Sequence, residues 1–204
     1  MSCDNKFFNI VKAYCDVKDY FNIIKTLHQK FTKNNKFTPM TKKDLEDAVE
    51  CFMEDRKSAI IIFGHMNTWD VSKITDMSCL FQWHTYFNED ISSWDVSNVI
   101  NMESMFEGCE VFNYPLNNWN VSKVTNMNSM FKKCETFNMP LDKWNVSKVT
   151  DMSNMFYMCE KFNQSLDKWY IYNLKTFNRM FNGCKYYQSN KPRWYNNIVI
   201  NRLV

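Results

Sequence analysis

Apolar residues recur at a fixed step of 25 positions along most of the chain. Tryptophan shows the step most clearly, and it occupies Trp69, Trp94, Trp119, Trp144, Trp169 and Trp194. Further apolar columns with the same step begin at Val71, Ile74, Met77, Phe81 and Phe87. Trp83 alone among the tryptophans falls outside the register. A sustained period of this length is typical of architectures in which one structural unit is stacked on the next.

One repeat, residues 141–165, illustrates the physics of the unit. Leu141, Trp144 and Val146 lie on one side of a segment whose other side is polar, which predicts an extended strand. The next apolar residues follow at steps of three and four, which predicts a short helical turn facing the same core; they are Val149, Met152, Met155, Phe156 and Cys159. Because one unit cannot bury its apolar side alone, we expect about five to six coils stacked through a parallel sheet.

The two ends of the array differ from its centre. Residues 37–64 predict a capping helix, in which Thr41 and Asp44 form a capping box and Gly64 ends the helix. Residues 65–193 form the repeat array, and residues 194–204 keep the register only in part, which predicts a degenerate cap coil. Residues 1–36 lie outside the array and predict a helical segment that acts as a cap or a docking arm.

The recurring motif W-D-V-S-K-V-T-D-M-S-x-M-F-x-x-C-x-x-F-N resembles the BspA-like leucine-rich-repeat family, whose function is unknown. This repeat is common in mycoplasma surface lipoproteins and also occurs in protists and giant viruses. The resemblance covers about Phe37 to Val204. It implies an α/β fold, a leucine-rich-repeat-like right-handed solenoid with 25-residue coils and an N-terminal helical cap. It also implies protein binding, and the family has no established catalytic activity.

Charge and composition restrict the setting of the chain. The 25 basic and 22 acidic residues nearly balance, so we expect no nucleic-acid partner. The sequence contains no apolar run of about 18 residues, so we expect no membrane span. Asp4, Lys6 and Lys12 interrupt the stretch where a signal peptide would be apolar, which predicts an intracellular or virion protein with free thiols.

The chemically reactive residues do not predict catalysis. Cys109, Cys134, Cys159 and Cys184 form a column, and a line of thiols does not converge on a tetrahedral zinc ion. We therefore interpret them as a buried ladder and expect no metal or cofactor. The three histidines show no pairing motif with an acid, so we expect no enzyme. A second column, made of Asn88, Asn113, Asn138 and Asn163, predicts amide hydrogen bonds between turns.

The polar side of the predicted strand is the candidate partner-binding surface. Its columns change from acidic through neutral to basic and aromatic along the array, and aromatic side chains are enriched at the energetically dominant positions of interfaces. Ordinary variation of a solvated surface explains the same columns. The candidate residues are Asp70, Asp95, Asn120, Asn145, Tyr170, Lys143, Lys168 and Tyr172.

Three functions remain open from the sequence. The first is a non-enzymatic protein–protein interaction module that presents this strand face to viral proteins, such as a capsid protein, or to host proteins. The second is a structural component of a viral particle. The third is a ubiquitin-ligase substrate adaptor, because residues 15–31 faintly resemble the second half of an F-box, although the usual Leu-Pro opening is missing.

Overall fold

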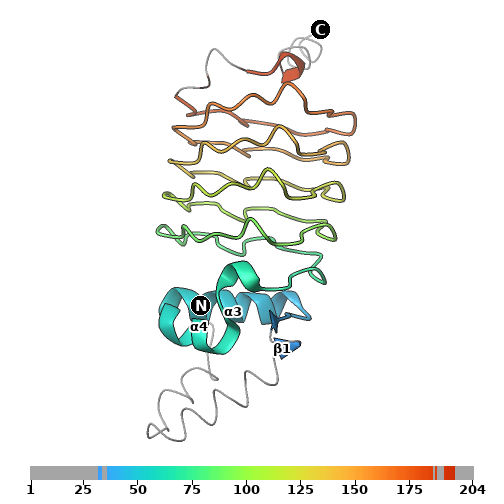
Figure 1. Ribbon diagram of the computed structural model, residues 1–204. Helices are drawn as coiled ribbons and strands as arrows, with labels where there is room; N and C mark the ends of the chain where they lie inside the picture. Colours follow the sequence, from blue (N-terminus) through green and yellow to red (C-terminus); the bar gives the residue numbers. More distant parts are fainter. Residues whose placement is uncertain (1–31, 34–35, 186, 188–190, 196–204) are drawn as a thin grey trace, which may run out of the picture.

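Residues one repeat apart lie over one another in the computed structural model, which describes residues 32–33, 36–185, 187 and 191–195. Figure 1 shows a stack of coils with the helices at one end. Backbone hydrogen bonds join each coil to the next: the N–H of Phe106 donates to the carbonyl of Met130, and the N–H of Phe131 donates to that of Met155, both at 2.9 Å. The predicted F-box-like segment lies outside the described residues.

The helical end begins with a short antiparallel pair, β1 (Thr32–Lys33) and β2 (Lys36–Phe37). Two helices follow, α3 (Lys42–Glu54) and α4 (Arg56–Phe63), and then one 3-10 turn, η1 (Met66–Thr68). The predicted capping box of Thr41 and Asp44 is present, and Gly64 ends α4 with a φ of 75°. A single helix over 37–64 is wrong, because the Asp55 side chain accepts the N–H groups of Lys57 and Ser58 and starts a second helix.

The helices cover the first coil through aromatic contacts. The Trp69 ring contacts the rings of Phe37 and Phe63 edge to face, with centroids 5.0 and 6.1 Å apart. Phe52 of α3 contacts the same indole at 6.2 Å. These rings remove the first tryptophan of the array from water, so it is as buried as the tryptophans farther along the stack.

The local backbone of a coil differs from the predicted strand and helical turn. The N–H of Trp144 donates to Leu141, and the N–H of Val149 donates to Val146, so this segment is a pair of tight turns and the strand prediction is wrong. Parallel pairing between coils occurs farther along each coil, after these turns, and it is limited to isolated bridges. The bridges join Asp76, Asn101, Asn126, Asp151 and Thr176 in order. Successive tight turns place residues three apart on one side, as a helix does, so this spacing alone does not distinguish the two structures.

The predicted helical turn over Val149–Cys159 is also wrong. Asn154 and Met158 have φ values of 56° and 58°, which lie in the left-handed region and interrupt a right-handed helix. The N–H groups of Asn154, Phe156 and Met158 donate to the next coil rather than within their own. The segment therefore alternates turns within one coil with hydrogen bonds between coils.

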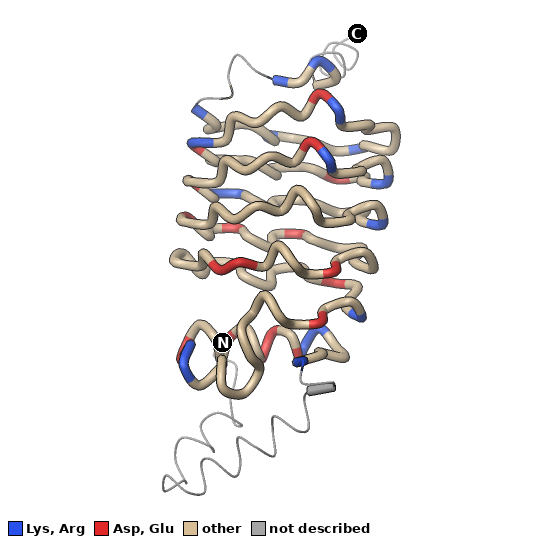
Figure 2. The backbone as a smooth tube through the Cα atoms, in the orientation of Figure 1, with Lys and Arg blue, Asp and Glu red and all other residues tan. Residues whose placement is uncertain are grey.

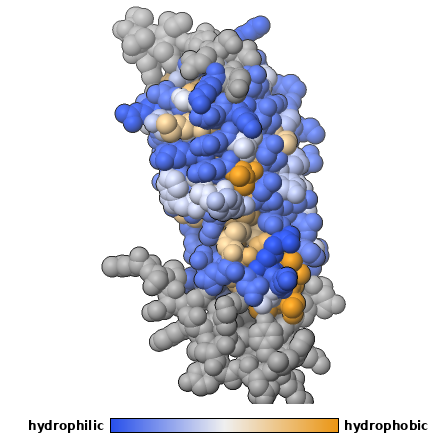
Figure 3. All heavy atoms as spheres, turned by 90° about the vertical axis from the view of Figure 1, so that its left-hand side faces the viewer, coloured by the Kyte–Doolittle hydropathy of each residue, from blue (hydrophilic) through white to orange (hydrophobic). Residues whose placement is uncertain are grey.

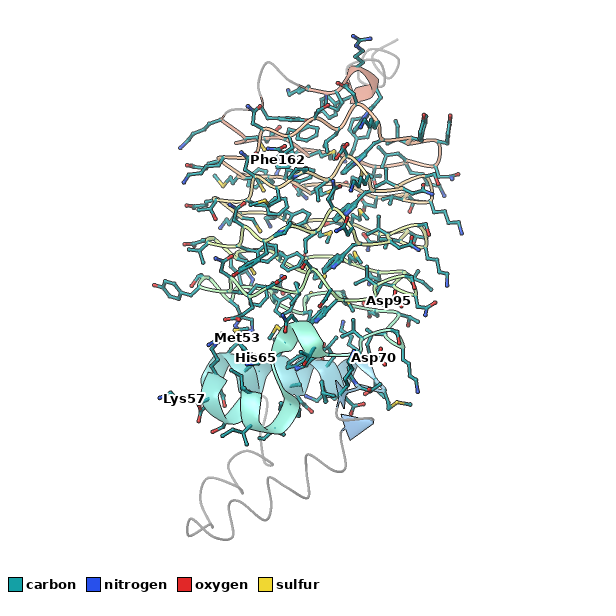
Figure 4. All side chains as sticks on the ribbon, in the orientation of Figure 1. Met53, Lys57, His65, Asp70, Asp95 and Phe162 are labelled. Carbon is teal, nitrogen blue, oxygen red and sulfur yellow. The ribbon has the colours of Figure 1, made fainter. Side chains whose placement is uncertain are left out.

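The core consists of the columns that the sequence predicts. Phe106, Phe131 and Phe156 are fully buried and stack at centroid separations of 5.4 and 5.7 Å; Phe162, in the neighbouring phenylalanine column, lies inside the stack (Figure 4). The tryptophans of the repeating column also satisfy their polar groups: the indole N–H of Trp144 donates to the Leu116 carbonyl at 2.9 Å. The same bond, 28 residues back, recurs at Trp94, Trp119, Trp169 and Trp194. Burial of these indoles therefore leaves no N–H group without a hydrogen-bond acceptor.

We predict that Trp144→Ala lowers the free energy of unfolding by about 3–5 kcal/mol, because it removes a buried ring and leaves a cavity. Ser147→Ala is the matched control. Its backbone groups keep their bonds to Asn145 and Asn173, so we expect a change within about 0.5 kcal/mol. Chemical denaturation of the two variants measures the difference, and equal effects would contradict the assigned faces.

Candidate protein-binding surface

The eight candidate residues lie directly before, between or after the tryptophan and valine columns. We call this surface the polar face. Asp70 and Asp95 lie on the same side of the stack, one above the other (Figure 4), and Tyr170 lies in the coil farthest from the helices among the five. Asp95, Asn120, Asn145 and Tyr170 are exposed, and Asp70 is half-buried. The structure thus places the predicted residues on one surface, formed by turns instead of a strand.

Four of these residues have a role within their own turn. The side-chain oxygens of Asp70, Asp95, Asn120 and Asn145 each accept the backbone N–H of the serine two residues later, at 3.0–3.2 Å. Asp and Asn commonly form this local bond, which stabilises a turn. Their presence in the column is therefore explained by the fold without a partner.

The fifth coil departs from this pattern. Tyr170 and Tyr172 replace the Asp/Asn and Ser of the other coils and are 67% and 83% exposed. Their rings are nearly parallel, with centroids 6.0 Å apart and an interplanar angle of 10°. Neither ring contributes to the core, so the coil does not need aromatic residues here to close.

The tyrosines border a groove of about 640 Å³. Its other walls come from the fourth and fifth coils: Asp142, Lys143, Trp144, Asn145, Ser147 and Lys168. We call it the tyrosine groove. It brings together five of the eight predicted residues, while Asp70, Asp95 and Asn120 lie outside its lining.

The charges of the tyrosine groove are partly compensated. Lys168 donates to Asp142 at 2.8 Å, and the Asn117 amide donates to the same carboxylate at 3.0 Å. These bonds lower the pKa of Asp142 below its ordinary value. Acidic and basic residues adjoin on the upper coils of the stack (Figure 2). Lys143 is exposed and takes part in no ion pair within the described part of the chain.

A second groove was not predicted from the sequence. Its volume is about 380 Å³, and it lies between the helices and the turn of the first coil. We call it the tryptophan groove. It is lined by Phe52, Met53, Arg56 and residues 83–89, among which Trp83 is 52% and Tyr86 89% exposed. The signal that was available is the position of Trp83, the one tryptophan out of register.

The cysteine and asparagine columns have structural roles. Each thiol of the cysteine column is buried and donates to a phenylalanine carbonyl of the preceding coil, as Cys134 does to Phe106 at 2.9 Å. Burial raises the pKa of these thiols, that of Cys184 to about 12. The Asn113 side-chain oxygen accepts the N–H of Asn138 at 2.9 Å, and the bond repeats along the column as predicted. Among the described residues, no three His, Cys, Asp or Glu side chains form a group that could hold a metal ion.

A protein family described as "Mycoplasma protein of unknown function, DUF285" matches residues 47–146 and 116–202, which together span more than half of the chain. The chain belongs to this family. No curated protein and no solved structure matches it. Membership of the DUF285 family agrees with the predicted repeat and assigns no role to the polar face. Within the residues that the structure describes, no helix combines the length and apolar character needed to cross a membrane.

The turn bonds of the polar face predict an acid-dependent stability. The Ser72 hydroxyl, together with its backbone N–H, donates to the Asp70 carboxylate and holds its pKa below the ordinary value of 3.8. The contribution of Asp70 to stability is thus present above pH 3.8 and is lost as the pH falls through the lower pKa of the folded state.

The Asp70→Asn variant keeps the hydrogen-bond acceptor and removes the titrating carboxylate. We expect its free energy of unfolding to fall less than that of the wild type between about pH 5 and pH 2, measured by denaturation at each pH. The same pH dependence in both proteins would contradict this role for Asp70.

Proposed function

We propose that this DUF285-family chain is a non-enzymatic protein–protein interaction module that binds a partner through the tyrosine groove. In this proposal it is a leucine-rich-repeat-like right-handed solenoid of the BspA-like type, in an intracellular or virion setting. The observation that carries the proposal is the exposed, nearly parallel pair of Tyr170 and Tyr172 beside the groove.

The energetics of an interface favour this site over the rest of the polar face. Tyrosines bury much area on binding and lose little side-chain entropy, and here the mutual packing of the rings has already restricted them. Lys143 and Lys168 supply polar contacts at the rim, where Asp142 orients the second of them. The first four coils present only short Asp, Asn and Ser side chains at the corresponding positions of the tyrosines.

A nucleic-acid partner would also use exposed rings near basic residues. The groove argues against it, because Asp142 carries a negative charge on its wall and neutralises Lys168. Backbone phosphates require several uncompensated cations. The alternatives of a viral structural component and a ubiquitin-ligase adaptor stay predictions from the sequence.

The test is affinity capture with the immobilised chain, comparing the wild type with the Tyr170→Ala/Tyr172→Ala double variant. We expect the double variant to lose the specifically captured protein by at least about 10-fold, as for residues that dominate an interface. Ile100→Ala is the control, because it removes a half-exposed apolar side chain that lines neither groove, and we expect it to retain capture. Undiminished capture by the double variant, or capture that nuclease treatment abolishes, would contradict the proposal.

A further inference from the structure

The tryptophan groove has a rigid aromatic wall. The backbone N–H of Trp83 donates to the Glu107 carbonyl at 2.7 Å. Its ring lies against Gly108, where a Cβ atom would come within 2.4 Å of the indole. The Lys133 ammonium, two coils away, lies 5.1 Å from the ring centroid, within the range of a cation–π contact. The indole is therefore held in place although half of it is exposed.

Stacking of the coils does not require this ring. The equivalent positions in the following coils are Gly108, Lys133, Met158 and Gly183. All five residues of this column have a positive φ, 65° at Trp83, and this backbone conformation favours glycine over tryptophan. A bulky residue placed in a left-handed conformation and left half exposed indicates a surface that binds something.

The rest of the groove combines apolar surface with an acidic rim. Figure 3 shows apolar side chains gathered beside the helical end on a face that is otherwise mostly hydrophilic. Arg56 pairs with Glu89 through two bonds of 3.1 Å, which cancels its charge. Glu50 and Glu54 lie one turn apart on the exposed side of α3, and the Glu50 carboxylate reaches within 3.8 Å of His84 in the groove lining.

We infer that the tryptophan groove binds an extended, proline-containing segment of a partner protein, with a basic residue of that segment beside Glu50 and Glu54. Polyproline II segments dock into grooves lined by aromatic rings, and their preformed backbone loses little entropy on binding. Trp83 and Tyr86 supply the rings. The acidic rim complements a lysine or arginine.

This inference is independent of the tyrosine groove, and its test uses defined probes. Three synthetic peptides of about ten residues are titrated into the full chain by calorimetry. The first has a Pro-x-x-Pro core with a flanking arginine, the second carries glutamate in place of the arginine, and the third carries alanines in place of both prolines. We expect saturable binding of the first peptide and at least about 10-fold weaker binding of the third. The second should bind several-fold more weakly than the first.

Variants of the chain assign the binding to the groove. Trp83→Ala should weaken binding of the first peptide by at least about 10-fold. Tyr86→Ala, at a residue too exposed to affect folding, should weaken it several-fold. Tyr170→Ala is the control in the other groove and should leave it unchanged. Absence of saturable binding by the first peptide, equal binding of the first and third peptides, or equal binding by the wild type and the Tyr86→Ala variant would overturn the inference. None of these results bears on capture through Tyr170 and Tyr172.

Discussion

Hydrogen bonds between consecutive coils constrain every other feature of this molecule. The N–H groups of one coil donate to carbonyl groups of the next, as from Gly108 to Lys132 and from Lys133 to Tyr157. The register of these bonds fixes residues one repeat apart in columns, so a side chain that suits one coil must stack on its equivalents. Large flat rings stack well in this way, which accounts for the phenylalanine columns. The tryptophans from Trp94 onward also meet the requirement, because each indole N–H bonds to a carbonyl of the preceding coil.

The same constraint separates structural residues from candidate functional ones. A column member that resembles its neighbours, such as Asn120 or Asn145, is explained by the turn that it stabilises. A member that differs and lies exposed, such as Trp83 or Tyr172, is not explained by the stack. Both proposed binding sites lie at residues of this second kind, at opposite ends of the array. The chemistry of each site then indicates the kind of partner it binds. The site at one end has paired rings and lysines, and the site at the other end has a fixed indole with an acidic rim.

Periodicity in the sequence was sufficient to predict the buried columns, since a side chain in a fixed register faces the same way in each coil. The buried Trp144 and Phe131 confirm that inference. The capping box at Thr41 confirms the separate prediction of where the capping helix begins. The backbone within a coil was not predictable in this way. Successive tight turns and a short helix give the same spacing of Met152, Met155 and Phe156, and left-handed residues such as Asn154 carry no sequence signal as clear as glycine. The tryptophan groove depends on the break between α3 and α4, which the apolar pattern of residues 37–64 does not reveal.

Hydrogen exchange of the indole N–H groups, followed by NMR, tests the stacking of the coils most directly. The indoles of Trp119 and Trp144 donate to carbonyl groups of the preceding coil and are 3% exposed, so they should exchange only when the coils separate. The half-exposed indole of Trp83 is the internal reference and should exchange far faster. Exchange of all three at the rate of Trp83 would contradict the columns on which the architecture and both proposed binding sites depend.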